Sequence, residues 1–491
     1  MSLWRPEDTT RATAALPGVA DGVWRSDILD AIEETIAGMD EELRALSLDI
    51  HDHPELMFEE HRTHDLLTAF FEKKGFTVTR HYILDTGWQA VWEHGEGGRT
   101  IGVNCEMDAL RGIGHACGHN LIAIAGVAVA CAVKAALARF DIKGKVVVLG
   151  TPAEEGGGGK VIMLKHGAYK GMSACLMCHP APGPKGSVSL TSCLAIQHVE
   201  VDAHAALSPW EGRNALDAAV LAYNNISALR QQLKPTYRVH GVFEGRDWAV
   251  NGEFVAPYAK YTVAMRTPTL AELKPLVDRV IPCLEAAAMA AGVKYKINTL
   301  GETFDLRQNT ALGADVADTV RRRYGAIDYE YGIKSASTDF GNVTYALPAL
   351  HPGFAIPTVP GGGNHTPEFT AAAATPEAHA ACLDVSKALA LTGVRVVTDE
   401  VFERKVSGRE VVIETEFSQP RTLSIPRTSI PSSRGSEGCA WCILVNEDCG
   451  LKQRTFNEPS SLRSGTPSRR TRSSAGRLSS TRPISWSSSG A

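Results

Sequence analysis

Residues 100–150 read TIGVNCEMDALRGIGHACGHNLIAIAGVAVACAVKAALARFDIKGKVVVLG, and they carry the clearest structural pattern in the chain. The segment opens with a strand-like run at 100–104, passes through a loop punctuated by glycines and enters an apolar helix after Asn120. A short apolar strand follows at 145–149, bounded by Gly144 and Gly150. Strands that alternate with helices predict an α/β layered body.

The alternation continues on both sides of this segment. Apolar residues at helical spacing predict a helix at 26–50 and a second helix at 60–74. Strands are expected at 77–79 and 88–92, and a last helix at 376–391. The main domain therefore occupies both the early and the late parts of the chain.

The pattern changes after Pro180. Strand, helix, strand, strand, helix, strand follow one another between 187 and 300, which predicts a small α+β domain of ferredoxin-like type inserted into the main domain. The expected division is an extension at 1–25, a discontinuous main domain at 26–186 and 301–410, the inserted domain at 187–300 and a tail at 411–491.

The tail differs from the rest in composition and charge. Of the 50 Lys and Arg and 55 Asp and Glu in the chain, residues 451–491 hold 8 and 1, which is +7 and leaves 42 − 54 = −12 elsewhere. A mildly acidic body is not typical of a nucleic-acid-binding fold. The Ser-, Arg- and Pro-rich tail is expected to be disordered. Translation past the natural end of the protein would produce a segment of similar composition, and this alternative explanation of the tail stays open.

The N-terminal segment, the longest apolar run and the cysteines indicate the cellular compartment of the protein. The polar N-terminal segment shows no apolar signal region, and the run from Leu121 to Leu137 is interrupted by Lys134, so we interpret it as a buried helix and expect no membrane span. The 11 cysteines, an odd number, favour free thiols in a reducing compartment, and a cytoplasmic location is expected.

Two clusters near these strands could carry chemistry. His115-Ala116-Cys117-Gly118-His119-Asn120 offers thiolate and imidazole, the usual ligands of zinc-like cations, although a capped helix start is the plainer explanation. Glu154 and Glu155 follow the strand at 145–149. Adjacent carboxylates there could divide the work, one ligating a cation and one acting as general base, or form an exposed acidic turn.

Three further histidines stand out. His179 is expected to end a strand before Pro180, whereas Cys175 and Cys178 would point to opposite faces of that strand. His365 follows three glycines, and His204 lies in the inserted domain. Together with the two clusters, these residues supply what a hydrolytic metal site needs: ligands, a free carboxylate and room for water.

The motifs, in this order, resemble the aminoacylase/carboxypeptidase family of co-catalytic metallopeptidases, in particular its amidohydrolase branch with the Xaa-Arg dipeptidase and β-alanyl-lysine dipeptidase-like group. The likeness rests on GIGHACGHNLIA at 112–123, TPAEEGGGG at 151–159, PWEGRNALDAAVLAYNNISALRQQ at 209–232, and the STDFGNV and GGGNHTPEF strings. It covers roughly residues 26–405. It implies a di-metal α/β catalytic domain with an inserted lid that mediates dimerisation.

The resemblance also implies residue roles. The implied metal ligands, with the thiolate expected to bridge up to two ions per subunit, are Cys117, His119, Glu155, His179 and His365. Glu154 matches the general base of amide hydrolysis, and His204 the lid histidine that helps bind the oxyanion. Asp108 resembles a carboxylate that orients a ligand imidazole, and Asn251 and Arg266 match positions that hold the substrate carboxylate.

The implied activity is hydrolysis of small dipeptides, including those with a basic C-terminal residue, or of N-acyl amino acids. The cofactor is a divalent metal; a thiolate ligand favours zinc, and manganese is the alternative. A homodimer formed through the lid is expected, without nucleic acid or membrane partners. Two other functions stay open at this point: an amide hydrolase of secondary metabolism, and a non-catalytic scaffold that retains the fold.

Overall fold

The computed structural model describes residues 22–204, 213–246, 256, 258–328 and 336–408. The segment quoted first folds as expected into β3 (Arg99–Glu106), α5 (His119–Arg139) and β4 (Gly144–Thr151), with β3 and β4 parallel. Of the described helices, α5 alone has the length and apolar composition to cross a membrane, and most of it is buried inside the protein. It is the central helix of the core, because apolar residues cover its whole circumference.

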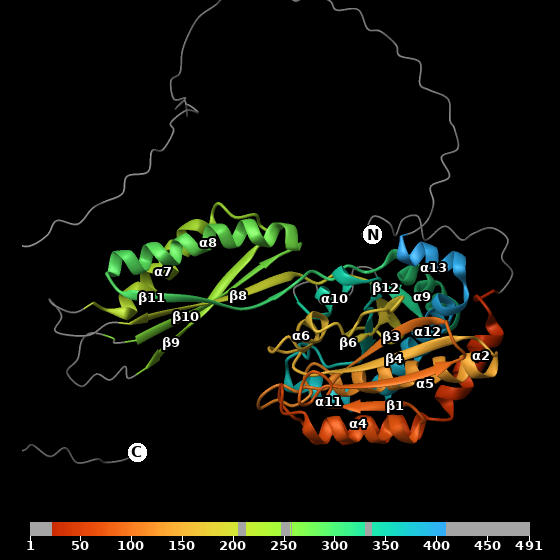
Figure 1. Cartoon of the computed structure of the whole chain (residues 1–491). Coiled ribbons are helices and arrows are strands. Elements are labelled where there is room, and N and C mark those ends of the chain that lie inside the picture. Colours follow the sequence, from red (N-terminus) through yellow and green to blue (C-terminus); the bar gives the residue numbers. More distant parts are fainter. Residues whose placement is uncertain (1–21, 205–212, 247–255, 257, 329–335, 409–491) are drawn as a thin grey trace, which may run out of the picture. The chain divides into compact units, whose positions relative to one another are not determined.

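A six-stranded sheet forms the centre of the main domain (Figure 1). Its order is β1-β2-β4-β3-β5-β13, with β1 (Thr77–Arg80), β2 (Trp88–His94), β5 (Ala174–Leu176) and β13 (Ala349–Leu350). β1 and β2 run antiparallel to their neighbours, and β4, β3, β5 and β13 are parallel to one another. The mixed α/β class expected from the sequence is confirmed.

The sheet is covered on both faces, and residues alternate between the two cores. Val146 and Val148 of β4 pack in the core that includes α5, whereas Val147 and Leu149 pack in a second core with Met163. On the α5 side lie α2 (Ser26–Ala37), α3 (Asp40–Asp52) and α12 (Pro376–Thr398). The second core involves α6 (Gly159–Lys165) and α10 (Phe340–Ala346).

Other helices and a small sheet complete the main domain. The remaining helices are α4 (His61–Lys73), α9 (Thr310–Arg323), α11 (Pro367–Ala373) and α13 (Glu400–Ser407). The small sheet has the order β12-β7-β14-β6, formed by Ala326–Asp328, Ser187–Ser189, Gly353–Ile356 and His179–Pro182. This sheet matters for the site, because β6 begins with His179.

The inserted domain has the expected order of elements. Its sheet, β11-β8-β10-β9, comprises Lys294–Thr303, Ala195–His204, Tyr258–Thr267 and Arg238–Arg246. The helices α7 (Ala215–Arg230) and α8 (Leu270–Ala291) pack against it and against each other. Leu273, Val280 and Leu284 of α8 are buried in the core of this domain.

Three local expectations are corrected. The strand expected at 187–201 is two strands, and Ser187–Ser189 pairs with β12 and β14 of the main domain, so the inserted domain begins near Ala195 and its last strand runs to Thr303. The single helix expected at 26–50 is broken at Gly38 into α2 and α3. Val23 is buried in the main core, so that core begins before Ser26.

Candidate active site

The site residues meet where parallel strands of the large sheet end. β3 ends at Glu106, and the loop after it leads to His119, the first residue of α5. β4 ends at Thr151, shortly before Glu154 and Glu155. Ligands of open α/β sheets bind outside the carboxyl ends of the strands, so this edge is where chemistry is expected.

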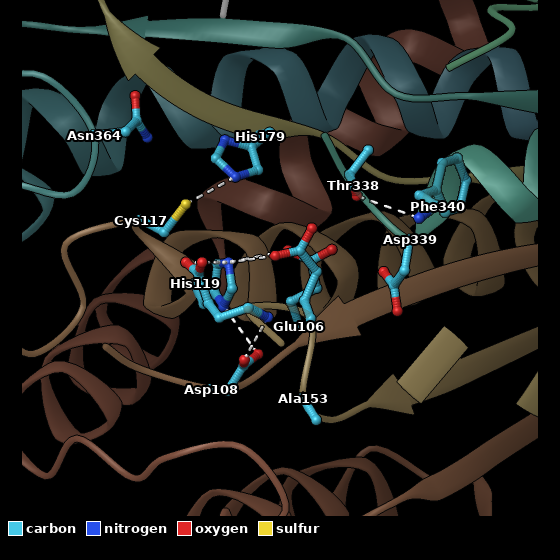
Figure 2. Close-up of polar contacts among 12 residues, drawn as sticks. Glu106, Asp108, Cys117, His119, Ala153, His179, Thr338, Asp339, Phe340 and Asn364 are labelled. Atoms are coloured by element: carbon cyan, nitrogen blue, oxygen red, sulfur yellow. Dashed lines mark hydrogen bonds and ion pairs between the residues drawn. The ribbon is translucent and has the colours of Figure 1, made fainter. Parts of the chain in front are cut away.

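A thiol and two imidazoles form the first group of potential ligands. Cys117, His119 and His179 each offer one donor atom, and these atoms all lie within 4.8 Å of one another. Cys117 Sγ is 3.3 Å from His179 Nε2 (Figure 2). His179 Nδ1 donates to the Pro180 carbonyl oxygen at 2.7 Å, which leaves Nε2 as the ligating nitrogen. His179 opens β6 and does not end β5, contrary to the sequence-based expectation.

A second group shares the same thiol. Donor atoms of Cys117, Glu155 and His365 also lie within 4.8 Å of one another, and His365 Nε2 is 3.4 Å from Glu155 Oε2. His365 has a φ of 68°, in the left-handed region, and its backbone N–H donates to the Ala116 carbonyl at 2.9 Å. Cys117 therefore belongs to both groups, and its sulfur is the donor atom that they share.

Asp108 connects the two sides of the site. Its Oδ1 accepts a hydrogen bond from His119 Nδ1 at 3.2 Å, and its Oδ2 accepts one from the Glu155 backbone N–H at 2.9 Å (Figure 2). The first contact presents His119 Nε2 to the ligand cluster, as carboxylates commonly do for metal-binding histidines. The second holds the start of the loop that carries Glu155.

Glu154 and Glu155 are adjacent, but their surroundings act on them in opposite directions. Burial, together with the charges of Glu106 and Glu155, raises the pKa of Glu154 well above its usual value. Burial also opposes ionisation of Glu155, but the hydrogen bond with His365 and the charge of His119 outweigh it and lower its pKa to about 2. A pair of carboxyl groups separated in this way suits one proton carrier and one permanent ligand.

A buried ion cluster that the sequence analysis missed lies beside His119. Lys160 Nζ is 2.7 Å from Glu106 Oε1 and 2.6 Å from Asp339 Oδ1, and all three side chains are inaccessible to solvent. Asp339 Oδ2 also accepts the Lys160 backbone N–H at 2.8 Å. Glu106 Oε2 is 3.3 Å from His119 Nε2 (Figure 2). Burial raises the pKa of Glu106, but Lys160 and His119 outweigh this and lower it to about 2.

The sequence contained weak signals for this cluster. Glu106 precedes Asp108 by two residues, Lys160 directly follows four glycines, and Asp339 lies in the STDFGNV string. None of these residues has a ligand-like spacing to the others. Their pairing depends on β3, α6 and α10 meeting in the folded chain.

The donor groups open into a cavity of about 440 Å³. Besides site residues, its lining includes Arg266, His198 and Thr338. Arg266 therefore lies at the cavity, as its expected role requires, and burial lowers the pKa of its guanidinium. Asn251 and the side chain of His204 fall outside the described residues, although the backbone of His204 ends β8.

The donor set fits divalent cations. Within the described residues, His119 Nε2 and Glu155 Oε1 are buried atoms that make no hydrogen bond, and both face the shared space. Around this space, the described part of the chain places five carboxylates, those of Glu106, Asp108, Glu154, Glu155 and Asp339. The permanent positive charges there are the ammonium of Lys160 and the guanidinium of Arg266. An excess of negative charge in a largely buried site needs compensation, which bound cations would supply.

Comparison with known proteins supports this chemistry. Residues 102–391 match the family described as peptidase family M20/M25/M40. The chain belongs to this family. It is 39% identical to the human Xaa-Arg dipeptidase over 381 residues, which cover 73% of this chain and 86% of the relative. A p-aminobenzoyl-glutamate hydrolase chain of Escherichia coli is 27% identical, with 78% of this chain and 94% of the relative covered.

The same fold occurs in solved structures of M20 enzymes. A dinuclear metal-binding M20 peptidase of Bacillus subtilis superposes with a TM-score of 0.57 at 20% identity, over 74% of this chain and 99% of that structure. The family match over residues 102–391 and the 39% identity to the human Xaa-Arg dipeptidase confirm the expected family. This M20 protein is a metal-dependent hydrolase of peptide or amide bonds.

Proposed function

We propose that this M20 enzyme is a dipeptidase that cleaves small dipeptides with a basic C-terminal residue. The observation that carries the proposal is the shared thiol: Cys117 belongs to two donor groups, one with His119 and His179 and one with Glu155 and His365. A single sulfur between two such groups supports a site for a pair of divalent cations. The human Xaa-Arg dipeptidase supplies the substrate class.

The residues of the chain divide the reaction among them. Bound cations would polarise the scissile carbonyl and make water a stronger acid. Glu154, with its raised pKa, accepts the proton of the attacking water and delivers it to the amine as the C–N bond breaks. Asp108 keeps His119 oriented and holds the backbone of Glu155. His204 is proposed to help bind the oxyanion, a role that the family resemblance implies.

Arg266 is proposed to hold the carboxylate of the substrate. It lines the same cavity as Cys117 and Glu154, and a guanidinium can bind a carboxylate through two parallel hydrogen bonds. A free C-terminal carboxylate is present both in dipeptides and in N-acyl amino acids. In this role Arg266 would favour substrates with a free carboxylate, and the basic side chain of the substrate would be recognised by other residues. The proposed role of Asn251 is the same as that of Arg266.

A substrate panel on metal-reconstituted protein tests the proposal. Chelation is expected to abolish hydrolysis, and addition of zinc or manganese to restore it, because the ligand set cannot position water by itself. Dipeptides ending in Arg or Lys, β-alanyl-lysine among them, should be cleaved with a higher kcat/KM than N-acetyl amino acids. Preferential cleavage of N-acetyl amino acids would replace the dipeptidase assignment, and turnover that survives chelation would contradict the metal site.

Zinc is the proposed metal. A thiolate and three imidazoles in the donor set favour a borderline-soft cation, whereas a set made of oxygen ligands alone would favour manganese. Metal analysis of protein purified without chelator distinguishes zinc from manganese.

We also propose a cytoplasmic location, supported by the eight described cysteines, all of which are free thiols.

A homodimer through the inserted domain is proposed on the basis of an exposed apolar surface. Val220 and Tyr223 of α7 and Val242 and Phe243 of β9 are exposed, and β9 is an edge strand of its sheet. Tyr223 and Phe243 have ring centroids 5.9 Å apart, so the helix and the strand form one surface. Edge strands with apolar side chains are ready to pair with another chain.

Val242→Lys is expected to shift the protein from dimer to monomer in solution, since a charged residue on an edge strand prevents strand pairing. Light scattering after size-exclusion chromatography measures the mass. Val401→Lys is a matched control, because Val401 is similarly exposed but lies on α13 of the main domain. A wild-type protein that is already monomeric, or a Val242→Lys dimer, would contradict the proposed interface.

A further inference from the structure

The residue before the proposed base has an unusual backbone. Ala153 is fully buried and has a φ of 59°, in the left-handed region that alanine rarely adopts. Its carbonyl oxygen accepts the backbone N–H groups of Gly157 at 3.0 Å and Gly158 at 2.9 Å, so it also begins the glycine turn. The conformation of Ala153 therefore sets the direction in which Glu154 leaves β4.

A carboxylate from a distant part of the chain holds Ala153 in this conformation. Glu60 is fully buried, and its Oε1 accepts the Ala153 backbone N–H at 2.8 Å. Its Oε2 accepts the hydroxyl of Thr86, also buried, at 2.7 Å. Both carboxylate oxygens thus have partners, and the side chain has one defined orientation.

The helix that follows Glu60 does not need this carboxylate. Glu60 is the N-cap residue of α4, but its side chain makes no capping hydrogen bond. Glu55 takes over the capping, because its two oxygens accept the backbone N–H groups of Arg62 and Thr63, each at 2.8 Å. The carboxylate of Glu60 is therefore available for the turn at Ala153.

Glu154 lies between two anchored backbone groups. Glu60 holds the N–H of Ala153, and Asp108 holds the N–H of Glu155 at 2.9 Å. Buried carboxylates on both sides restrict rotation of the peptide units that carry Glu154.

We propose that Glu60 is a positioning residue for hydrolysis, which acts by fixing the left-handed turn at Ala153 and thereby directing the carboxylate of Glu154 into the site. This inference rests on the proposed role of Glu154 as the base. Among the described residues, the Glu60 carboxylate forms hydrogen bonds with Thr86 and with the Ala153 backbone. Its effect on hydrolysis would therefore pass through the backbone. A misplacement of about 1 Å at a reacting group can lower a rate by roughly 10²-fold.

The test compares kcat, KM and bound metal in Glu60→Ala and Glu60→Gln. Glu60→Ala is expected to lower kcat by about 10- to 10²-fold with KM and metal content close to wild type, because the ligands stay in place and only the base moves. Glu60→Gln should retain most of the activity, since the amide oxygen accepts the Ala153 N–H and its NH₂ can donate to Thr86 Oγ1.

Ala153→Gly supplies an independent readout. Glycine adopts positive φ without steric penalty, so the turn no longer depends on Glu60 to impose it. The fall in kcat caused by Glu60→Ala should be several-fold smaller in the Ala153→Gly background than in the wild-type background. Equal losses in both backgrounds would show that Glu60 does not act through the turn.

Asp315→Ala is the matched control for stability. Asp315 is also a buried carboxylate that accepts a threonine hydroxyl, that of Thr392 at 2.7 Å, but it lies on α9 and pairs with Arg395. Asp315→Ala should lower the melting temperature and leave kcat per metal-loaded protein unchanged.

A Glu60→Ala variant with wild-type kcat would overturn the proposal. Failure of the wild-type enzyme to cleave any dipeptide or N-acyl amino acid would overturn the function instead.

Discussion

Glu154→Gln is expected to lower kcat by about 10²- to 10⁴-fold, which is the usual contribution of a positioned general base. The amide retains the size and one acceptor oxygen of the carboxylate but cannot take the proton of water. Burial and the neighbouring charges of Glu106 and Glu155 raise the pKa of Glu154 in the native protein. This makes the carboxyl group a stronger base toward water and still able to return the proton to the amine.

Two control variants distinguish the loss of the general base from the loss of metal binding. Glu154→Gln should keep its bound metal, whereas Glu155→Gln should lose metal, because Glu155 belongs to a donor group with Cys117 and His365. Glu59→Gln is the matched exposed control, since its side chain is 75% exposed, and it should behave as wild type. Unchanged turnover in Glu154→Gln would show that another residue is the base.

Lys160→Met is expected to lower the free energy of unfolding by about 3–5 kcal/mol, the usual result of removing one partner from a buried ion cluster. The ammonium lies 2.7 Å from Glu106 and 2.6 Å from Asp339, and all three side chains are fully buried. Methionine fills a similar volume but leaves Asp339 without its ammonium partner, and Glu106 keeps only His119, at 3.3 Å, of its two partners. Urea unfolding of metal-loaded protein measures the change.

The buried ion cluster also predicts how the loss of stability in Lys160→Met can be reduced. In Lys160→Met/Asp339→Asn the unpaired charge of Asp339 is removed, so the double variant should lose less stability than the sum of the single variants. Lys274→Met is the control, because Lys274 is 81% exposed and pairs with the exposed Asp278 at 3.5 Å. Its effect should stay within about 0.5 kcal/mol. A Lys160→Met protein as stable as wild type would contradict the account.

Local spacing made several features predictable. Cys117 and His119 are two residues apart in one loop, and Glu154 and Glu155 are adjacent after a buried strand, so their convergence needed little tertiary information. Boundaries were less predictable. The strand-like residues from 187 to 201 belong to two sheets, because β7 finds its partners in β12 and β14, which come more than a hundred residues later.

The sequence by itself determined the α/β alternation, the inserted domain and the chemical types of the proposed ligands, because periodicity and short spacings are local properties of the chain. The resemblance had already indicated Asp108 as a supporting carboxylate, and the tertiary structure alone decided the others. Glu60 reaches Ala153, and Lys160 reaches both Glu106 and Asp339, across long stretches of chain. Such contacts depend on which helix ends and strand ends meet after folding, and a buried charge finds its partner only there.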